Sequence, residues 1–297
     1  GRLDGSIQTL PNPDLFVAMY VRKEAVLSSQ IEGTESSLQD LLAAEAKVHT
    51  PDQPGDVGEV FNYVRAMNHG LSRLPALPVS RRLICDIHAD LLRGGELRSR
   101  QNWIGAPGSR VTEAVFVPPP VDVVPDALRD LERFLHDDTT LPILIKIGLV
   151  HAQFETIHPF LDGNGRVGRL LITFLLCEQA VLLKPVLYLS YFFKRNRPEY
   201  YDRLQAVRDH GDWEGWLAFF LQGICEVSQQ ATETARLILD LREQHRAIVT
   251  EHFGRIAGNG HRVIEFLYAH PIVSVTDIAQ LTGTTFGISS ARIPASS

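Results

Sequence analysis

The chain has 297 residues, a net charge of −6 at pH 7 and a pI near 6.0, with 44% hydrophobic and 22% charged residues. This composition can bury a full core, and the acidic balance argues against bulk nucleic-acid binding. No apolar run reaches membrane-spanning length and no signal-peptide pattern opens the chain, so we expect a cytoplasmic protein with no membrane partner. Three widely separated cysteines indicate reduced core positions rather than a metal site or a disulfide framework.

The chain opens with a helical pattern that stops at a glycine. Helical spacing runs from residue 14 to residue 31, and Gly33 is a natural stop after the last turn. A second helix is predicted over 37–48, where Ser36 and Gln39 have the spacing of a capping box. A linker rich in proline and glycine covers 49–58, and two more helices are predicted over 59–74 and 80–92.

The middle of the chain combines one hairpin with the most apolar helix. Residues 103–120 alternate apolar and small side chains around a glycine-rich turn and end in three prolines, which predicts a short exposed hairpin. An amphipathic helix is predicted over 124–137. An apolar helix over 141–157 should lie at the centre and deliver His158 at its end. Downstream, the aromatic residues expected in the core are Trp213, Trp216, Phe219 and Phe220.

The C-terminal part resembles the opening of a winged helix. Residues 261–283 predict a helix, a short apolar stretch and a second helix with its turn. The following run, ISSARIPASS, has Arg292 as its one basic residue and is interrupted by Pro294, so it makes a poor recognition helix for DNA. We therefore predict an N-terminal helical region over 1–75, a core domain over 76–222, and a C-terminal helix with a truncated winged helix over 223–297.

A short loop after His158 has the features of an anion-binding nest. Gly163, Asn164 and Gly165 are typical of a tight loop, and a helical run follows at once. Free backbone N–H groups at a helix start bind anions, and flanking glycines allow the backbone to approach an oxyanion closely. The Asn164 amide can add a further donor.

The charged residues around this loop suit polyphosphate chemistry. Arg166 and Arg169 lie three residues apart on the new helix, should project toward the same mouth and need an anionic partner. Asp162 would repel a phosphate by itself and suits a Mg²⁺ that bridges phosphates. His158 can accept a proton near pH 7. Taken singly, these residues also fit an ordinary turn or cap. A metal site that includes His151 is conceivable from spacing alone, and the simpler interpretation makes that residue a core histidine.

The same segment resembles the Fic motif, H-x-F-x-[D/E]-G-N-G-R-x-x-R, at every specified position. The resemblance implies an all-α fold: a Fic-type helical bundle with a small β-hairpin flap, N-terminal inhibitory helices and a C-terminal partial winged helix. It also implies a protein adenylyltransferase that binds ATP with Mg²⁺ and transfers AMP to a Ser, Thr or Tyr hydroxyl of a target protein, which can be itself. By this resemblance His158 is the general base, Asp162 holds Mg²⁺, Asn164 takes the α-phosphate, and Arg166 and Arg169 take the outer phosphates.

Two further sets of residues follow from the resemblance. The nucleotide-binding set, completed by an adenine-side wall, comprises Asp162, Gly163, Asn164, Gly165, Arg166, Val167, Gly168, Arg169, Tyr200, Tyr201 and Arg208. The closing strand of the flap, which would register the target segment by strand addition, comprises Glu113, Ala114, Val115 and Phe116.

The end of the first predicted helix resembles the inhibitory motif of the same family, [S/T]-x-x-x-E-[G/N], with Ser28, Glu32 and Gly33 at its specified positions. A glutamate on the last turn is unfavourable to the helix dipole, and an outside cation would offset that cost. The resemblance gives Arg169 as this cation and implies that the ion pair blocks seating of the γ-phosphate. A glutamate before a glycine is also a common helix end, so an ordinary cap is the alternative.

Three functions of different classes stay open, and an adenylyltransferase restrained by its own Glu32 is the leading one. A Fic-type transferase of another phosphate-containing group is the second. A DNA-binding regulator with a nucleotide-sensing Fic core is the third, suggested by the partial winged helix. The sequence leaves open the identity of the target protein and the formation of a homodimer.

Overall fold

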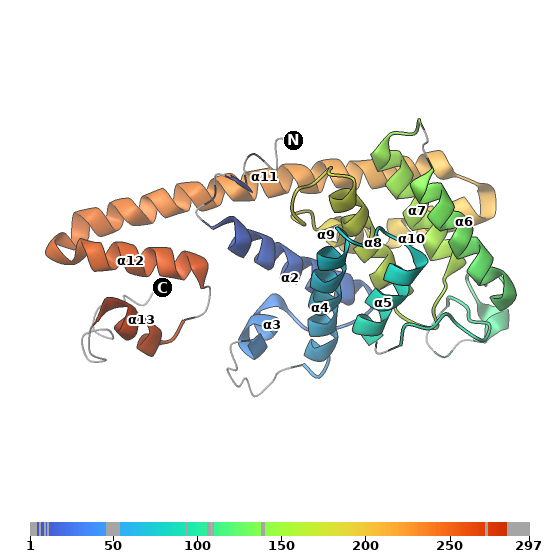
Figure 1. The fold of residues 1–297 in the computed structure, drawn as a ribbon, viewed down its shortest axis with the longest axis horizontal. Coiled ribbons are helices and arrows are strands. Elements are labelled where there is room, and N and C mark those ends of the chain that lie inside the picture. Colours follow the sequence, from blue (N-terminus) through green and yellow to red (C-terminus); the bar gives the residue numbers. More distant parts are fainter. Residues whose placement is uncertain are drawn as a thin grey trace.

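The fold is dominated by helices, as predicted. The computed structural model describes residues 5, 7–8, 10, 12–45, 54–92, 94–105, 108, 110–137, 140–270 and 273–283. The α-helices (Figure 1) are α2 (Pro13–Ile31), α3 (Leu38–Glu45), α4 (Val57–Arg73), α5 (Arg81–Leu92), α6 (Val124–His136), α7 (Ile143–Ile157), α8 (Asn164–Glu178), α9 (Leu189–Arg195), α10 (Arg197–His210), α11 (Trp213–His252), α12 (Ala257–Ala269) and α13 (Val275–Thr282). Short 3₁₀ turns form η1 (Val111–Glu113), η2 (Val121–Val123) and η3 (Gly254–Ile256).

The longest element, α11, extends along the whole molecule. Figure 1 shows the helical bundle packed under one end of α11, with α12 and α13 under the other end. α11 is 40 residues long. Its sequence contains neither proline nor glycine after Gly223, so the helix continues to His252. It therefore crosses the position between residues 222 and 223 where the sequence suggested a boundary.

The helix that precedes the His158 loop lies at the centre of the bundle. α7 packs against α6, α8, α10 and α11. The indole N–H of Trp216 donates to the Gly148 carbonyl at 2.8 Å and so fixes α11 to α7. Trp216, Phe219 and Phe220 are buried, as predicted, and Trp213 is half-buried. α7 is thus packed on several sides by other helices.

The first helix, α2, is docked between α4 and α9 through a buried carboxyl group. Glu24 is 4% exposed and accepts hydrogen bonds from the Ser190 backbone N–H at 3.2 Å and the Tyr63 hydroxyl at 3.4 Å. The Ser190 hydroxyl donates to the same carboxyl group. Burial raises the pKa of Glu24 to about 7. The helix ends as predicted, with Glu32 as its C-cap and Gly33 at φ 107°.

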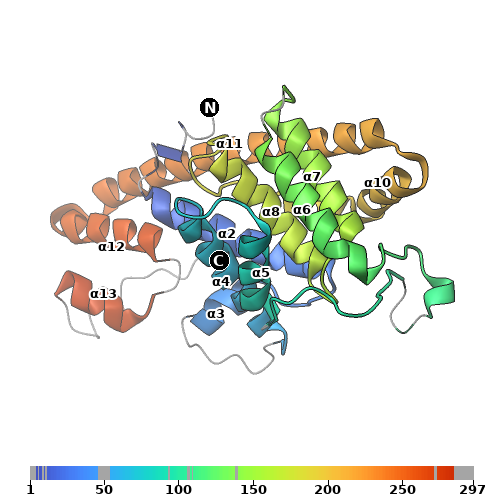
Figure 2. The same ribbon diagram turned by 45° about the vertical axis from the view of Figure 1, so that its right-hand side comes forward.

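The predicted hairpin over 103–120 is not confirmed. Within the described residues its β structure is one antiparallel bridge between Ile104 and Phe116, and residues 111–113 form the turn η1. The Glu113 carboxylate accepts from the Arg110 backbone N–H at 3.0 Å, which favours the turn over a strand. Figure 2 shows this segment, called the flap below (residues 103–120), as an arm that reaches away from the bundle.

The C-terminal helices α12 and α13 pack on each other and α12 packs on α11. Ser274 and Asp277 form a capping box at the start of α13, which accounts for its sharp beginning. The predicted recognition segment, residues 288–297, lies outside the described residues, as does part of the predicted linker over 49–58. In the described part of the chain, no helix combines the length and apolar character needed to cross a membrane.

Candidate active site

The loop between α7 and α8 is closed by its own side chains. His158 caps α7 in the left-handed region, at φ 49° and ψ 59°, so the chain turns sharply at the end of the central helix. The Asn164 amide accepts from the Phe160 backbone N–H and donates to the Phe160 carbonyl, both at 2.8 Å. Asn164 is 2% exposed and Phe160 is fully buried. The Asn164 side chain therefore shapes the loop, a use that the sequence did not suggest.

Three residues from outside the motif support the same loop. His88 of α5 stacks on the Phe160 ring with centroids 3.8 Å apart, and its Nε2 lies 3.0 Å from the Asp162 carbonyl oxygen. The Arg98 guanidinium donates to the His158 carbonyl at 3.0 Å, and the Asn102 amide donates to the Phe160 carbonyl at 2.9 Å. Sequence reasoning missed all three because they lie about 60 to 70 residues upstream. For Arg98 and Asn102 the one local signal is a polar run, RSRQN, ahead of the flap, and His88 lies outside it.

His158 is held as a neutral imidazole. Burial lowers its pKa to about 4, and the cationic side chains of Arg208 and Arg98 act in the same direction. Glu32 opposes them but does not outweigh them. At pH 7 the ring can therefore accept a proton, which is the state that a general base requires.

The N-terminus of α8 faces a carboxylate of the protein itself. Gly163 is the N-cap at φ 78°, and a side chain there would also meet Leu92 Cδ1 at 2.7 Å. A Cβ atom at Gly165 would collide with Glu32 Oε1. The first turn of α8 is therefore open to close approach by an anion, and the Glu32 carboxylate lies against it.

Arg169 binds to the end of α2 through an ion pair and hydrogen bonds. Its Nη2 lies 2.5 Å from Glu32 Oε1 and 3.0 Å from the Ser28 carbonyl oxygen, and its Nε donates to the Ser28 hydroxyl at 2.7 Å. The guanidinium is 2% exposed. Although burial works against its charge, the Glu32 carboxylate leaves the pKa of Arg169 above its usual value. The ion-pair partner predicted from the resemblance is thus the one observed.

Arg166 has a different partner. Its Nη1 lies 2.7 Å from a carboxylate oxygen of Glu59 in α4, and its Nη2 lies 3.7 Å from Asp162 Oδ2. Arg166 is buried, whereas the Asp162 side chain is 77% exposed. The two motif arginines, predicted to share one mouth, are each bound to a carboxylate from a separate N-terminal helix.

The next turn of α8 packs against a second buried carboxyl group. Val167 is fully buried, and a Cβ atom at Gly168 would collide with Glu155 Oε1. Glu155 lies one turn before His158 on α7, and burial raises its pKa to about 7. Gly168 therefore permits α7 and α8 to approach closely beside the loop.

The predicted adenine-side wall does not form one open surface. Tyr200 is 1% exposed, and its hydroxyl lies 2.8 Å from His151 Nε2. The other His151 nitrogen lies 3.0 Å from the Gly168 carbonyl, and burial lowers the pKa of this histidine to about 3. His151 is thus a core histidine, and among the described residues no group of three potential ligands could hold a metal ion. Tyr201, at 40% exposed, remains accessible.

Arg208 reaches the flap. Its guanidinium lies 4.1 Å from the centroid of the Phe116 ring and donates to the Glu155 carbonyl at 3.0 Å. Of the predicted flap residues, Glu113 belongs to η1, Ala114 is half-buried, Val115 is 65% exposed and Phe116 carries the bridge to Ile104.

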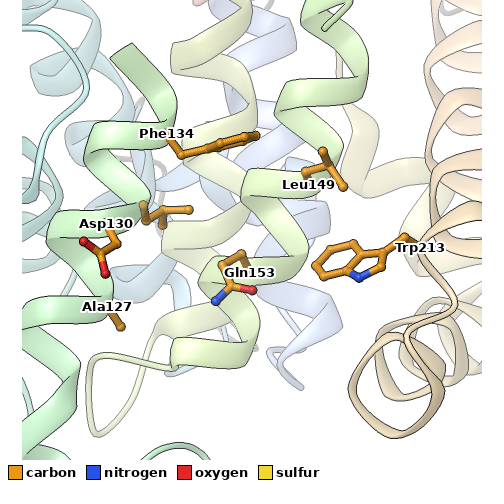
Figure 3. Close-up of a pocket in the computed structure, with 7 residues that line it drawn as sticks. Ala127, Asp130, Phe134, Leu149, Gln153 and Trp213 are labelled. Carbon is orange, nitrogen blue, oxygen red and sulfur yellow. The ribbon is translucent and has the colours of Figure 1, made fainter. Parts of the chain in front are cut away.

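An open hollow between α6, α7 and α11 is separate from this loop. Its lining residues are Ala127, Asp130, Leu131, Phe134, Leu149, Gln153 and Trp213 (Figure 3). The lining combines apolar side chains with one carboxylate and one amide, and it contains no cation that could bind phosphate. The His158 loop is therefore the better candidate for the active site.

Comparison with known families finds two family models that match this chain. Residues 1–72 match the model described as Fic/DOC family N-terminal, and residues 78–176 match the Fic/DOC family model. The chain belongs to the Fic/DOC family. The solved structure of a Fic family protein from Desulfovibrio desulfuricans superposes with a TM-score of 0.66 at 25% identity, covering 92% of this Fic protein and 77% of that chain. A Fic-domain signalling protein from Bacteroides thetaiotaomicron gives 0.64 at 19% identity, covering 79% and 94%.

Curated relatives carry names that refer to one activity. A probable protein adenylyltransferase of Aquifex aeolicus is 31% identical over 205 residues, which are 65% of this Fic protein and 57% of that relative. A protein adenylyltransferase of Caenorhabditis elegans is 29% identical over 124 residues, 40% and 21% of the two chains. This Fic protein thus spans little more than half of the first relative and about a fifth of the second.

Proposed function

We propose that this Fic protein is a protein adenylyltransferase that transfers AMP from ATP to a Ser, Thr or Tyr hydroxyl of a protein. The names of the relatives support this reaction class. The observation that carries the proposal is the arrangement of His158, as a neutral base, beside an open helix N-terminus that contacts an anion. A base and an anion cradle are the two elements that phosphoryl-type transfer requires.

The reaction balances with His158 as the proton acceptor. The acceptor hydroxyl gives its proton to the imidazole while its oxygen attacks the α-phosphorus of ATP. A new oxygen–phosphorus bond forms, the bond from the α-phosphorus to the α,β-bridging oxygen breaks, and pyrophosphate leaves. The low pKa of His158 leaves the ring unprotonated at neutral pH, so it is ready to accept this proton.

The first turn of α8 would receive the phosphates. Its backbone N–H groups and helix dipole favour negative charge, and Gly165 lets an anion approach. Because both bonds of the Asn164 amide to Phe160 hold the loop, these backbone groups would make the main contacts to the α-phosphate, while Arg166 and Arg169 would compensate the outer phosphates.

Asp162 fits a Mg²⁺ site that depends on the nucleotide. Its carboxylate is 77% exposed and lies at the start of the phosphate-binding turn. Mg²⁺ is commonly held by one or two carboxylates together with substrate phosphates and water, so a single exposed carboxylate is sufficient. The ion would neutralise phosphate charge during the transfer.

The contact between Glu32 and Arg169 would restrain the enzyme. The Glu32 carboxylate lies against Gly165 and binds Arg169, so it takes both an anion position and a cation that a triphosphate would need. An outer phosphate of ATP cannot bind Arg169 until Glu32 withdraws. We infer that withdrawal of this carboxylate is the activating step.

Labelling with ATP that carries the label at its α-phosphate tests the proposal. The wild type should label itself, or proteins of a cell lysate, weakly, and Glu32→Gly should label more strongly. Adding His158→Ala to Glu32→Gly should lower labelling by roughly 100-fold or more, because the base is lost. Equal labelling by all three proteins would refute both roles. Mass spectrometry of the product should show an added AMP, and a different phosphate-containing group would identify another Fic-type transferase.

A further inference from the structure

Arg208 contacts two elements beside the His158 loop, which are the last turn of α7 and the flap. From the last turn of α10, its Nη2 donates to the Glu155 carbonyl at 3.0 Å and its Nε lies 3.5 Å from the Thr156 hydroxyl, both on the last turn of α7. The guanidinium carbon also lies over the Phe116 ring of the flap, 4.1 Å from the ring centroid. One side chain thus connects the flap to the turn that ends in His158.

The base of the flap is held independently. The Arg98 guanidinium donates to the Pro119 carbonyl and to the His158 carbonyl, and the Gln101 amide donates to the Pro118 carbonyl at 2.9 Å. These bonds fix the proline end of the flap. The outer part has the bridge to Ile104 and the contact between Phe116 and Arg208. Loss of Arg208 should therefore loosen the outer flap without releasing its base.

We propose that Arg208 is a positioning residue for the acceptor, because it fixes the Phe116 segment of the flap to the turn of α7 that carries His158, and that it is not a nucleotide-binding residue. The inference rests on the proposed adenylyl transfer. Its support is that, among the described residues, the hydrogen bonds and the ring contact of the guanidinium go to α7, to the flap and, at 3.3 Å, to Gln205 of its own helix.

The chemistry of arginine suits this position. A planar guanidinium can stack on an aromatic ring and donate in its own plane to carbonyl groups, whereas a lysine ammonium lacks a flat face. A cation at the C-terminal turn of α7 also interacts favourably with the helix dipole. Phe116 lies between Val115 and Val117, which are 65% and 46% exposed, so its position sets where these two outward residues meet an acceptor segment.

Arg208 also acts on the charge state of His158. The charged groups that face His158 are Arg208 of α10, Arg98 ahead of the flap and Glu32 at the end of α2; the two arginines lower its pKa and Glu32 raises it. Glu155, on the same helix as His158, contributes its backbone carbonyl. Because a neighbouring cation disfavours the imidazolium, removal of Arg208 should raise the pKa of His158.

Hydrogen exchange of the flap tests the inference without any activity measurement. In the Glu32→Gly background, Arg208→Met and Phe116→Leu should each speed exchange of the Val115 and Phe116 amides, which both bond to the Ile104 carbonyl, by roughly threefold to tenfold. The double variant should exchange no faster than the faster single variant, because the two changes remove the same contact. Arg203→Met is the matched control, since Arg203 lies on the same helix and pairs with Glu199. Unchanged exchange in Arg208→Met would overturn the inference.

Binding of ATP with Mg²⁺ separates the inference from an adenine-side role. Arg208→Met should bind ATP within about threefold of its parent, and a loss of more than tenfold would place Arg208 on the nucleotide and overturn the inference. If Glu32→Gly fails to label any protein, the proposed function fails, and the exchange and binding measurements still decide the position of Arg208.

The pH profile distinguishes the charge of Arg208 from its shape. In Arg208→Met, the acidic limb of the labelling rate should move to higher pH, since His158 loses a neighbouring cation. Arg208→Lys should restore the limb but not the exchange protection. An unshifted limb in Arg208→Met together with unchanged exchange would contradict the inference on both counts.

Discussion

On the α2 side of the His158 loop the protein places a carboxylate, whereas on the flap side it places two arginines. Glu32 lies against the first turn of α8 and on Arg169. Arg98 and Arg208 instead donate to main-chain carbonyls at and just before His158. A phosphate can replace the Glu32 carboxylate on Arg169, whereas the carbonyls bound by Arg98 and Arg208 belong to the backbone that carries His158. The α2 side is therefore suited to exchange with a nucleotide, and the flap side is suited to lasting support.

The largest expected effect concerns how α2 is held. Glu24 has a pKa of about 7 in the folded protein, above its ordinary value, so the fold favours the protonated carboxyl group. Stability from this group is present at low pH and falls by roughly 3 kcal/mol as the pH rises from about 4.5 to about 8. Glu24→Gln should remove this slope in denaturant unfolding measured across that range. Glu155 titrates with the same sign and stays in both proteins. If the free energy of unfolding fell equally with pH in both proteins, the titration of Glu24 would make no contribution to how α2 is held.

The charge of Glu32 should have the next largest effect, on nucleotide affinity. Glu32→Gln keeps the size of the side chain but removes the anion from Arg169, and ATP should bind roughly 30- to 100-fold more tightly in calorimetric titration. Glu59→Gln is the matched control, because Glu59 pairs with the other motif arginine, Arg166, at 2.7 Å and is half exposed. That control should change ATP affinity by less than about threefold. Equal gains in both variants would remove the difference between the two arginines.

The hydrogen bonds inside the loop should stabilise it in addition to the support from the two sides. Asn164→Ala loses two hydrogen bonds to Phe160 in a buried site and should lower the free energy of unfolding by about 2 kcal/mol. Asn196→Ala, which loses one half-buried bond to the Phe192 carbonyl, should cost less than about 1 kcal/mol. Denaturant unfolding of both variants measures the difference. A cost at Asn164 no larger than at Asn196 would mean that the loop is held mainly from outside.

The smallest expected effect compares two neighbouring serines of α2. Ser28→Ala removes the hydroxyl that accepts from Arg169 Nε at 2.7 Å and should weaken the restraint by about 1 kcal/mol, which is roughly a fivefold gain in ATP affinity. Ser29 is equally buried, and its hydroxyl has no hydrogen-bond partner among the described residues. Ser29→Ala should leave ATP affinity unchanged. A similar gain in both variants would point to loosening of α2 as a whole.

Much of the fold followed from local patterns. The stop of α2 before Gly33, the apolar helix before His158 and the start of α8 at the glycine loop all agree with the structure, because caps and turns depend on residues within about four positions. The hairpin predicted from the local pattern is not confirmed. Its alternating pattern competed with a local bond from the Arg110 backbone to Glu113, which favoured the turn η1.

The residue types of the candidate site follow from the sequence, whereas the contacts that their side chains make do not. Asn164 was expected on a phosphate and holds the loop, Tyr200 was expected on an adenine wall and bonds to His151, and Arg208 was expected beside them and covers Phe116. Asn164 bonds within its own loop, to Phe160 four residues earlier, whereas Tyr200 and Arg208 meet partners on other elements. The contacts of Tyr200 and Arg208 therefore depend on packing, which no local spacing encodes.

By itself, the sequence determined a glycine-framed loop that opens a helix, a histidine ahead of it, and a glutamate at the end of an upstream helix that stops at a glycine. These features depend on backbone geometry and capping within a few residues. The family resemblance gave Arg169 as the partner of Glu32, 137 residues away, and the tertiary structure alone decided that Arg98 and His88 hold the loop and that Arg208 connects the flap to α7. The physical reason is that such contacts form only when packing of the apolar faces of α2, α7, α8 and α10 brings distant charges within hydrogen-bonding distance.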